Sequence, residues 1–220
     1  MAATLRPLKQ DPAKDPTLEL ERMRFAAGAP LVIGIDEVGR GAIAGPVAVG
    51  VQVVFAGTDT FPEGLRDSKL LSEPRRDALA PLIREWGPGA VGFGSAEEIY
   101  ERGITAMLGE AARRALLKLH KQGVPVSSAL ILLDGSHDWL TPVLQSPLTI
   151  ETRVGADRSC ASVAGASVRA KVERDAIMRD AHDTHPHYAW DSNKGYGAAA
   201  HYAGIAERGI TEMHRASWIK

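Results

Sequence analysis

The sequence predicts an α/β fold, in which a mixed β-sheet has helices packed on both faces and a small helical extension follows at the C-terminus. Two β-branched segments separated by a glycine-rich connection occur early in the chain and predict a hairpin of buried strands. Further along, short apolar segments alternate with segments of helical periodicity. A hairpin followed by this alternation is typical of a mixed sheet with helices on either side.

Residues 1–30 are expected to form a mobile leader that ends in a short helix. The leader is polar up to about residue 17 and is interrupted by prolines, whereas residues 18–27 have helical character. No apolar run follows its basic residues, so a secretory signal is not expected. No stretch approaches the roughly 18 uncharged apolar residues of a transmembrane helix, and we expect a cytoplasmic protein without membrane contact.

Residues 31–220 are expected to form the main domain, which begins with the hairpin. Val and Ile dominate both hairpin strands, and this composition predicts that the strands are buried. A later helix repeats apolar residues every three or four positions, so one of its faces should pack on the sheet. In chain order, the expected elements are strands Leu31–Asp36 and Pro46–Phe55, helix Glu73–Trp86, strand Ala90–Ala96, and helices Ala96–Tyr100 and Ile104–Gln122.

The second half of the domain is expected to add two strands and two helices. The first of these strands is apolar up to its last residue, which is typical of a fully buried strand. A long stretch with helical spacing follows, and an alanine-rich segment begins the last helix. The expected elements are strands Ala129–Asp134 and Pro147–Val154, and helices Ser159–Arg179 and Ala198–Arg208.

The composition of the 220 residues suits one globular domain. The chain is 45% hydrophobic and 24% charged, and its 26 basic residues nearly balance its 27 acidic ones. The molecule as a whole is therefore not a cationic body, and any contact with nucleic acid must use a local basic patch. The single cysteine, Cys160, excludes an internal disulfide and a cysteine-rich zinc site, and we interpret it as a packing residue.

Two aspartates end apolar strands of the predicted sheet. Asp36 and Asp134 each follow a run of aliphatic residues, and their carboxylates would meet at one edge if the two strands are parallel neighbours. Neighbouring buried carboxylates are unfavourable unless a cation compensates their charge. Ligands that offer only oxygen favour Mg²⁺ or Mn²⁺ over zinc. Two such ions can activate a water and stabilise a leaving oxygen, so this pattern indicates phosphodiester hydrolysis.

The same aspartates also fit a purely structural role. Taken singly, Asp36 or Asp134 could cap a turn or the following helix, which is a common use of aspartate. Glu37, directly after Asp36, favours the metal site. Neighbours in a strand point to opposite faces, so this interpretation requires the strand to have ended before both carboxylates reach one ion.

Six motifs stand in order along the chain: GIDEVGRGAIAGPV at residues 34–47, DSKLLS at 67–72, LLDG at 132–135, GADRSCASVAGASVRAKVERD at 155–175, NKGYG at 193–197 and MHRASW at 213–218. Together they resemble bacterial type 2 ribonuclease H, ribonuclease HII, over nearly everything from residue 31 onward. The resemblance implies a ribonuclease H-like catalytic domain. It also implies a site of four carboxylates that binds two Mg²⁺ or Mn²⁺ ions, formed by Asp36, Glu37, Asp134 and Asp157.

The resemblance also implies which residues contact the substrate. Gly39, Arg40 and Gly41 would face the ribonucleotide, and the glycines would let the backbone approach the 2′-OH that distinguishes RNA from DNA. The resemblance further implies phosphate contacts through Arg40, Ser68 and Lys69, and stacking of Tyr196 on the sugar after the ribonucleotide. We therefore expect a monomeric endoribonuclease. It would cut RNA–DNA hybrids and duplex DNA with embedded single ribonucleotides, and leave 3′-hydroxyl and 5′-phosphate ends.

Two other functions fit parts of the pattern. A structure-specific DNA nuclease on the same sheet would use the carboxylates but would not need Gly39–Gly41 or Tyr196 beside a ribose. A nucleic-acid binding module without catalysis is disfavoured, because clustered carboxylates repel phosphate unless a metal is present.

Several other polar residues are interpreted as structural. Asp175 is too far along its helix from Asp157 to share a metal pair, about 27 Å at ~1.5 Å per residue, and it stands four residues after Lys171 as in a helical ion pair. Lys171 and Arg174 are expected on a solvated helix face, and Lys194 fits either a phosphate contact or a structural role. The remaining structural candidates are the hydrogen-bonded His201 and His214 and the packing residues Trp86, Trp139, Trp190 and Trp218.

Overall fold

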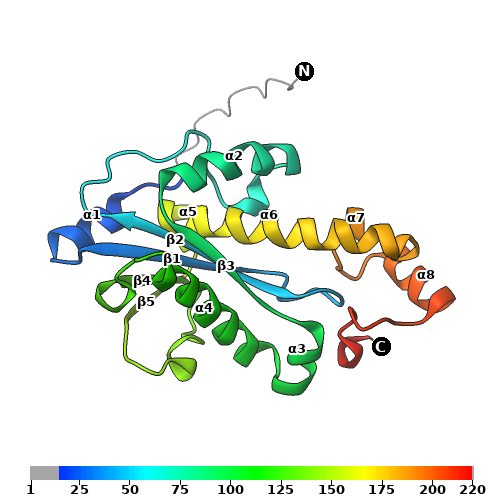
Figure 1. Ribbon diagram of the computed structural model, residues 1–220. Helices are drawn as coiled ribbons and strands as arrows, with labels where there is room; N and C mark the ends of the chain where they lie inside the picture. Colours follow the sequence, from blue (N-terminus) through cyan, green and yellow to red (C-terminus); the bar gives the residue numbers. More distant parts are fainter. Residues whose placement is uncertain (1–14, 220) are drawn as a thin grey trace.

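The computed structural model describes residues 15–219 and has a five-stranded sheet between helices (Figure 1). The strand order across the sheet is β3-β2-β1-β4-β5. The pairs β1–β2 and β2–β3 are antiparallel, whereas β1–β4 and β4–β5 are parallel, so the predicted mixed sheet is confirmed. The strands are β1 (Leu31–Val38), β2 (Val47–Phe55), β3 (Gly89–Gly94), β4 (Leu130–Asp134) and β5 (Thr149–Arg153).

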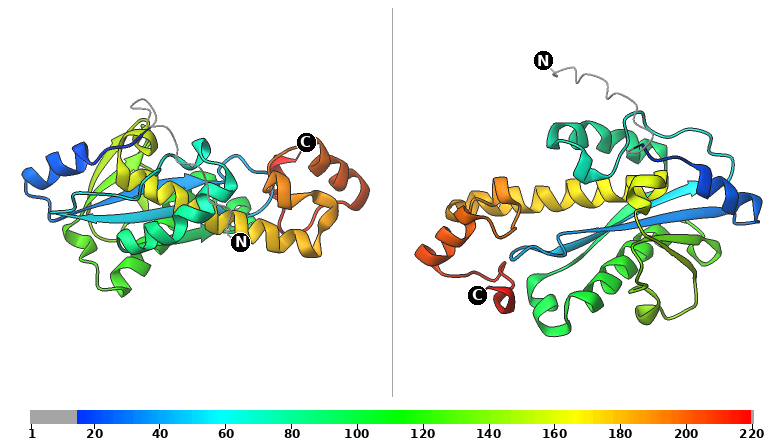
Figure 2. Two further views of the ribbon diagram at one scale, coloured as in Figure 1. Left: turned by 90° about the horizontal axis from the view of Figure 1, so that it is seen from above. Right: turned by 180° about the vertical axis from the view of Figure 1, so that it is seen from behind.

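Helices cover both faces of the sheet, as predicted. Helix α4 lies on one face and α6 on the other, and α6 runs beyond the sheet to carry the C-terminal extension (Figures 1 and 2). The helices are α1 (Glu19–Ala26), α2 (Glu73–Trp86), α3 (Ala96–Arg102), α4 (Ile104–Lys121), α5 (Ala156–Ser159), α6 (Ala161–Thr184), α7 (Trp190–Asn193) and α8 (Ala199–Arg208). Within residues 15–219, none of these helices combines the length and the apolar character needed to cross a bilayer.

Alternation along the strands divides the core into two layers. Leu31, Ile33 and Ile35 of β1 pack with the buried face of α4. The even-numbered Val32 of β1 and Leu132 of β4 instead pack on the side of α6. Because side chains alternate in a strand, Asp36 and Asp134 follow the register that faces α6.

Helix α6 rests directly on the backbone of the sheet at two glycines. A Cβ on Gly34 would lie 2.3 Å from the backbone carbonyl carbon of Ser162, and a Cβ on Gly50 would lie 2.2 Å from the carbonyl oxygen of Ala166. Real side chains do not approach backbone atoms this closely, so both positions require glycine. The close approach brings the N-terminal end of α6, with α5 before it, near the ends of β1 and β4.

The predicted short helix near the N-terminus is confirmed as α1, whereas the predicted leader up to residue 14 lies outside the described residues. Glu21 of α1 is buried, and its Oε1 accepts hydrogen bonds from the Ser162 backbone N–H at 2.9 Å and the Ser162 hydroxyl at 2.7 Å. Arg24 donates to both carboxylate oxygens of Glu151 in β5, at 2.8 and 2.9 Å. Helix α1 therefore caps α6 and braces the edge of the sheet.

Most predicted boundaries differ from the structure by one or two residues, and two of the differences matter for the site. Strand β1 does not end at Asp36 but continues to Val38, because β2 goes on pairing with it beyond that point. The helix predicted from Ser159 to Arg179 is divided into α5 and a longer α6, because Cys160 between them is extended, with φ −115° and ψ 124°. Cys160 forms a bridge with Thr17 there, which holds the chain out of helical conformation.

Candidate active site

Three of the four predicted carboxylates come together at the carboxyl ends of two parallel strands. Asp36 lies near the end of β1, Asp134 ends β4, and Asp157 lies in the first turn of α5. The Oδ1 atom of Asp134 accepts the backbone N–H of Ala156 at 2.8 Å and that of Asp157 at 3.4 Å. Asp134 thus caps α5, the structural use that the sequence left open, and also holds Asp157 beside β4.

Asp36 has the least favourable surroundings of the three. It is 1% exposed, its Oδ1 accepts the backbone N–H of Glu37 at 2.8 Å, and its Oδ2 is buried without a hydrogen-bond partner. Burial raises the pKa of Asp36 well above its usual range. The neighbouring charges that raise this pKa further are those of Glu37, Asp134 and Asp157. Burial also raises the pKa of Asp134, with the charge of Asp157 as the next cause.

Glu37 is close to this cluster, but its side chain points to the other face of β1. It stands opposite Val49, whose side chain belongs to the core beneath α4. Since β1 has not ended at this point, alternation directs Glu37 away from the face of Asp36. Burial raises the pKa of Glu37, and the guanidinium of Arg40, 3.6 Å from its Oε1, opposes that rise. The condition under which both acids would reach one ion, a strand that ends at Asp36, is therefore not met in this structure.

Lys69 brings a positive charge to the carboxylates. Its Nζ lies 3.1 Å from Asp157 Oδ2 and 3.9 Å from Asp67 Oδ1. Burial works to lower the pKa of Lys69, but the carboxylates of Asp36, Asp67 and Asp157 outweigh it and raise the pKa. The Lys69 side chain is 61% exposed, and its phosphate contact stays a prediction.

Asp67 is an acidic member of this region that we did not single out from the sequence. It is fully buried, its Oδ1 accepts the backbone N–H of Lys69 at 3.0 Å, and it begins the 3₁₀ turn of residues 68–70. Burial raises its pKa, and the charge of Asp157 adds to the rise. The available signal was its place at the head of the Asp67-Ser68-Lys69 turn, where aspartate commonly caps the following residues.

The chemistry of these residues fits a hard divalent cation. In the described part of the chain, no three His, Cys, Asp or Glu side chains lie close enough to hold a metal in their present positions. Asp36 Oδ2 and Asp67 Oδ2 are nevertheless buried without hydrogen-bond partners, although Arg158 lies 3.9 Å from Asp67 Oδ2. A buried carboxylate oxygen without a hydrogen bond is unfavourable unless a cation compensates its charge. All the candidate ligands are carboxylates, the donors that Mg²⁺ and Mn²⁺ prefer.

The predicted ribose-contacting segment belongs to a glycine-rich loop, residues 39–46, that joins β1 to β2. Gly39 has φ +81°, and a Cβ there would lie 2.0 Å from Nε of Arg174, so this position requires glycine for two reasons. Arg40 and Gly41 are exposed at the tip of the loop. The tip of the loop is therefore exposed to solvent, next to Glu37.

Tyr196 and Ser68 have different surroundings. Tyr196 is 40% exposed, and the guanidinium carbon of Arg174 lies 5.6 Å from its ring centroid, so one part of the ring is free for stacking. Ser68 is fully buried, and its hydroxyl accepts a hydrogen bond of 2.7 Å from Ser167. The structure does not bring Ser68 to the surface, and its position does not support the predicted phosphate contact.

The prediction of a solvated face is wrong for both Lys171 and Arg174, because Arg174 is fully buried and the Lys171 side chain is only 17% exposed. Arg174 donates to backbone carbonyl oxygens of the glycine-rich loop and of the segment before Tyr196. The predicted pair of Lys171 with Asp175 is confirmed, with Nζ 2.6 Å from Oδ1, and Arg76 lies 3.6 Å from the other oxygen of Asp175. The hydropathy pattern missed Arg174 because a charged residue in a helix usually faces solvent.

The remaining structural interpretations agree with the positions of the side chains. His201 and His214 are buried and hydrogen-bonded, with their Nε2 atoms 3.2 Å apart, and Trp190 donates to His201 Nε2 at 2.9 Å. Lys194 is 6% exposed and lies 3.3 Å from Oε1 of Glu73, which favours the structural role over a phosphate contact. The other three tryptophans pack against apolar clusters.

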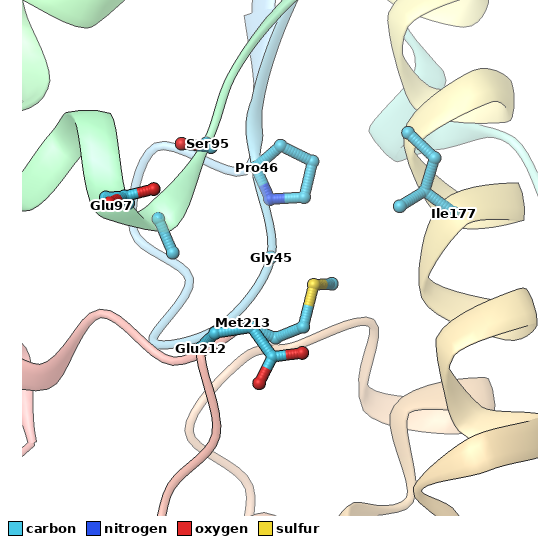
Figure 3. A pocket seen from close by; sticks show the side chains of 8 residues that line it. Gly45, Pro46, Ser95, Glu97, Ile177, Glu212 and Met213 are labelled. Atoms are coloured by element: carbon cyan, nitrogen blue, oxygen red, sulfur yellow. The ribbon is translucent and has the colours of Figure 1, made fainter.

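A cleft of about 530 Å³ lies beside the glycine-rich loop (Figure 3). Pro46, Ile177 of α6 and Met213 line it, and Glu97 and Glu212 stand at its edges. Both glutamates are exposed and would repel phosphate, so this cleft is not suited to a nucleic-acid backbone.

Comparison with known proteins shows the family of this chain. Residues 33–220 match the family model described as Ribonuclease HII. A ribonuclease HII of Streptomyces avermitilis is 44% identical over 209 residues, which cover 94% of this chain and 85% of that protein. A ribonuclease HII of Paracoccus denitrificans is 39% identical over 205 residues, covering 92% of this chain and 91% of that protein.

Solved structures show the same fold. Bst-RNase HIII in complex with Mn²⁺ has a TM-score of 0.67 at 24% identity, and the match covers 86% of this chain and 67% of that one. RNase HII from Archaeoglobus fulgidus, solved in complex with PCNA, has a TM-score of 0.63 at 23% identity and coverages of 86% and 96%. The ribonuclease H-like fold predicted from the motifs is thus confirmed. The chain is a metal-dependent ribonuclease and belongs to the ribonuclease HII family.

Proposed function

We propose that this enzyme hydrolyses the RNA strand of RNA–DNA hybrids and also incises duplex DNA at single embedded ribonucleotides. The observation that carries the proposal is the proximity of Asp36, Asp134 and Asp157 to one another, next to the exposed tip of the glycine-rich loop at Arg40 and Gly41. The carboxylates supply the site for phosphodiester hydrolysis, and the loop supplies a surface that a ribose can approach. The relatives named ribonuclease HII support the hybrid substrate.

The four carboxylates would hold the metal ions. We assign this role to Asp36, Glu37, Asp134 and Asp157, and the Mn²⁺ in the Bst-RNase HIII structure supports Mn²⁺ or Mg²⁺ as the cofactor. Two bound ions would supply an activated water and stabilise the leaving oxygen, giving 5′-phosphate and 3′-hydroxyl ends. Asp134 would orient Asp157 through the backbone N–H bonds of α5. Glu37 would reach the ions only after its side chain turns toward Asp36.

Recognition of the ribose would come from the loop tip and the nearby tyrosine. The backbone N–H groups of Gly39, Arg40 and Gly41 would approach a 2′-OH without obstruction by a Cβ at the glycines. Arg40 and Lys69 have exposed side chains that can contact phosphates. Tyr196 would stack on the sugar that follows the ribonucleotide. A cytoplasmic monomer suits this activity, and both features remain predictions.

The experiment that tests the proposal uses a DNA duplex with one ribonucleotide and an all-DNA duplex of the same sequence. Each is incubated with the protein and Mn²⁺, Mg²⁺ or EDTA. We expect metal-dependent cutting on the 5′ side of the ribonucleotide, with the all-DNA duplex intact. Cutting of both duplexes would favour the DNA nuclease instead, and cutting of neither would favour a binding module.

A further inference from the structure

The glycine-rich loop is held from the C-terminal side by a buried arginine. Arg215, 1% exposed, donates from Nη1 to the carbonyl oxygen of Arg40 at 2.8 Å and from Nη2 to that of Gly39 at 2.7 Å. The same Nη2 also donates to the carbonyl of Gly45 at 3.0 Å. The Gly45 backbone N–H in turn donates to Met213 at 2.8 Å, and Figure 3 shows these two residues together at one wall of the cleft.

A second buried arginine holds the same loop from the side of α6. Arg174 donates from Nε to the carbonyl of Pro46 at 2.8 Å and from Nη2 to that of Ala44 at 3.2 Å. Its Nη1 donates to the carbonyl of Lys194 at 2.8 Å, two residues before the Tyr196 ring that lies against the same guanidinium. Arg174 therefore links the two segments that the proposed function places against the ribonucleotide.

Burying these two arginines is energetically unfavourable compared with filling the same space with apolar side chains. In the described residues, their hydrogen bonds run to backbone carbonyls rather than to carboxylates. Burial lowers the pKa of Arg215 to about 9, and it also lowers the pKa of Arg174. A buried charge without a carboxylate partner contributes little net stability, whereas the planar fork of a guanidinium fixes several carbonyls at once. The geometry therefore favours a positioning role.

We propose that Arg174 and Arg215 are positioning residues that fix the backbone of Gly39–Gly41, and Tyr196 beside it, against the carboxylates, and so determine how well the enzyme acts on an isolated ribose. This inference rests on the proposed function. A single embedded ribonucleotide presents one 2′-OH at one position of the duplex, so a displaced loop no longer contacts it. A uniform hybrid presents a 2′-OH at every position, so a displaced loop still finds one.

The test is the ratio of kcat/KM on a single-ribonucleotide duplex to kcat/KM on a uniform RNA–DNA hybrid. The variants are Arg215→Lys and Arg174→Lys, which keep the charge but lose the fork. The ratio is internal to one preparation, so a smaller folded fraction does not change it. We expect it to fall at least about tenfold in both variants, because small misplacements reduce rates strongly.

The matched control is Arg169→Lys on the same helix. Arg169 is also buried, at 8% exposure, and donates to Ile83 and Gly87 carbonyls at 2.9 and 2.8 Å, far from the loop. Its ratio should stay within about twofold of the wild type. If Arg215→Lys does not fold, Arg215→Gln, which keeps a planar pair of N–H donors, takes its place. An unchanged ratio in folded Arg174 and Arg215 variants overturns the inference, whereas a wild type that cuts neither duplex overturns the proposed function.

Discussion

The two oxygen atoms of Asp134 are available for two different tasks. Its Oδ1 caps α5 through the backbone N–H groups of Ala156 and Asp157, which leaves Oδ2 for the cluster of carboxylates. The cap and the metal ligand, which stood as alternatives in the sequence, are compatible in one side chain. The cap also explains how Asp157, 23 residues later, is held beside β4.

Replacing Asp134 with Asn separates these tasks. The amide oxygen can still cap α5, so the free energy of unfolding should change by less than about 1 kcal/mol. The lost negative charge should reduce metal-dependent cleavage at least about 100-fold. Cleavage with Mn²⁺ and urea unfolding would be measured on the same preparation, with Asp138→Asn, at a capping aspartate of the 3₁₀ turn near Thr141, as the control. Near-normal turnover of Asp134→Asn would remove this residue from the proposed metal site.

Tyr196→Ala tests the stacking role of the exposed ring. We expect kcat/KM on a single-ribonucleotide duplex to fall about tenfold more than on a uniform hybrid, because loss of one stacking contact is worth ~1–3 kcal/mol. Tyr202→Ala is the matched control, since Tyr202 is 43% exposed against 40% for Tyr196. Equal losses on both substrates would contradict stacking by Tyr196.

The residues that could be predicted are marked by the sequence immediately around them. Those that could not be predicted owe their positions to contacts with distant segments of the chain. Asp36 and Asp134 each interrupt an aliphatic run, so the local sequence marks them. In the sequence, Arg174 and Arg215 look like ordinary surface charges. The backbone carbonyls to which they donate lie up to 176 residues away along the chain. Asp67 is hidden for the same reason, since its neighbour Asp157 comes from a distant segment.

At the scale of elements, helical periodicity located α6 but not its true limits. Small and apolar residues continue at helical spacing through Cys160, and neither Gly nor Pro marks a break there. The break arises from the bridge between Cys160 and Thr17, a contact with a segment 143 residues earlier. The end of β1 was missed in the same way, because continued pairing with β2, rather than composition, carries the strand through Glu37.

Glu21 replaces a local cap at the start of α6, where Cys160 offers no side-chain hydrogen bond. Glu21→Ala should lower the free energy of unfolding by about 1–3 kcal/mol, because the buried N–H of Ser162 loses its acceptor. Urea unfolding monitored by circular dichroism measures the change. Glu19→Ala on the exposed side of α1 is the control and should stay within about 0.5 kcal/mol of the wild type. A loss no larger than in this control would show that Glu21 contributes nothing as a cap.

At the scale of the whole molecule, two kinds of interaction join the C-terminal extension to the sheet domain. Apolar residues such as Met178, Tyr188 and Trp190 form one cluster with Ala44 of the glycine-rich loop. The second kind consists of hydrogen bonds from the guanidinium groups of Arg174 and Arg215 to backbone carbonyls. The sequence pattern predicted the mixed sheet and the existence of the extension. It did not predict the hydrogen bonds between the extension and the loop, because bonds to backbone carbonyls leave no pattern in side-chain composition.

We expect the buried histidine pair to make the stability of this arrangement depend on pH. Burial, followed by the nearby His201, lowers the pKa of His214 from 6.5 to about 4. The folded state thus binds a proton less readily than the unfolded state, so its stability is complete above pH 6.5 and falls as the pH drops toward 4. Between pH 7 and pH 5, the free energy of unfolding should decrease by about 2 kcal/mol from this group.

Urea unfolding at the two pH values measures this decrease. In His214→Gln the contribution should disappear, which makes the variant less sensitive to pH than the wild type. His120→Gln, at an exposed histidine, should leave the pH dependence unchanged. Equal pH dependence in wild type and His214→Gln would contradict the assignment.

The contact of α6 with Gly34 and Gly50 has a consequence for how this protein tolerates variation. Any side chain at either position would lift α6 off the sheet and with it the turn that carries Asp157. In a library of random variants selected for activity, these two glycines would be as invariant as the acids themselves, although neither touches a substrate. Sites chosen by invariance alone would therefore include residues whose only task is to keep two layers of backbone in contact.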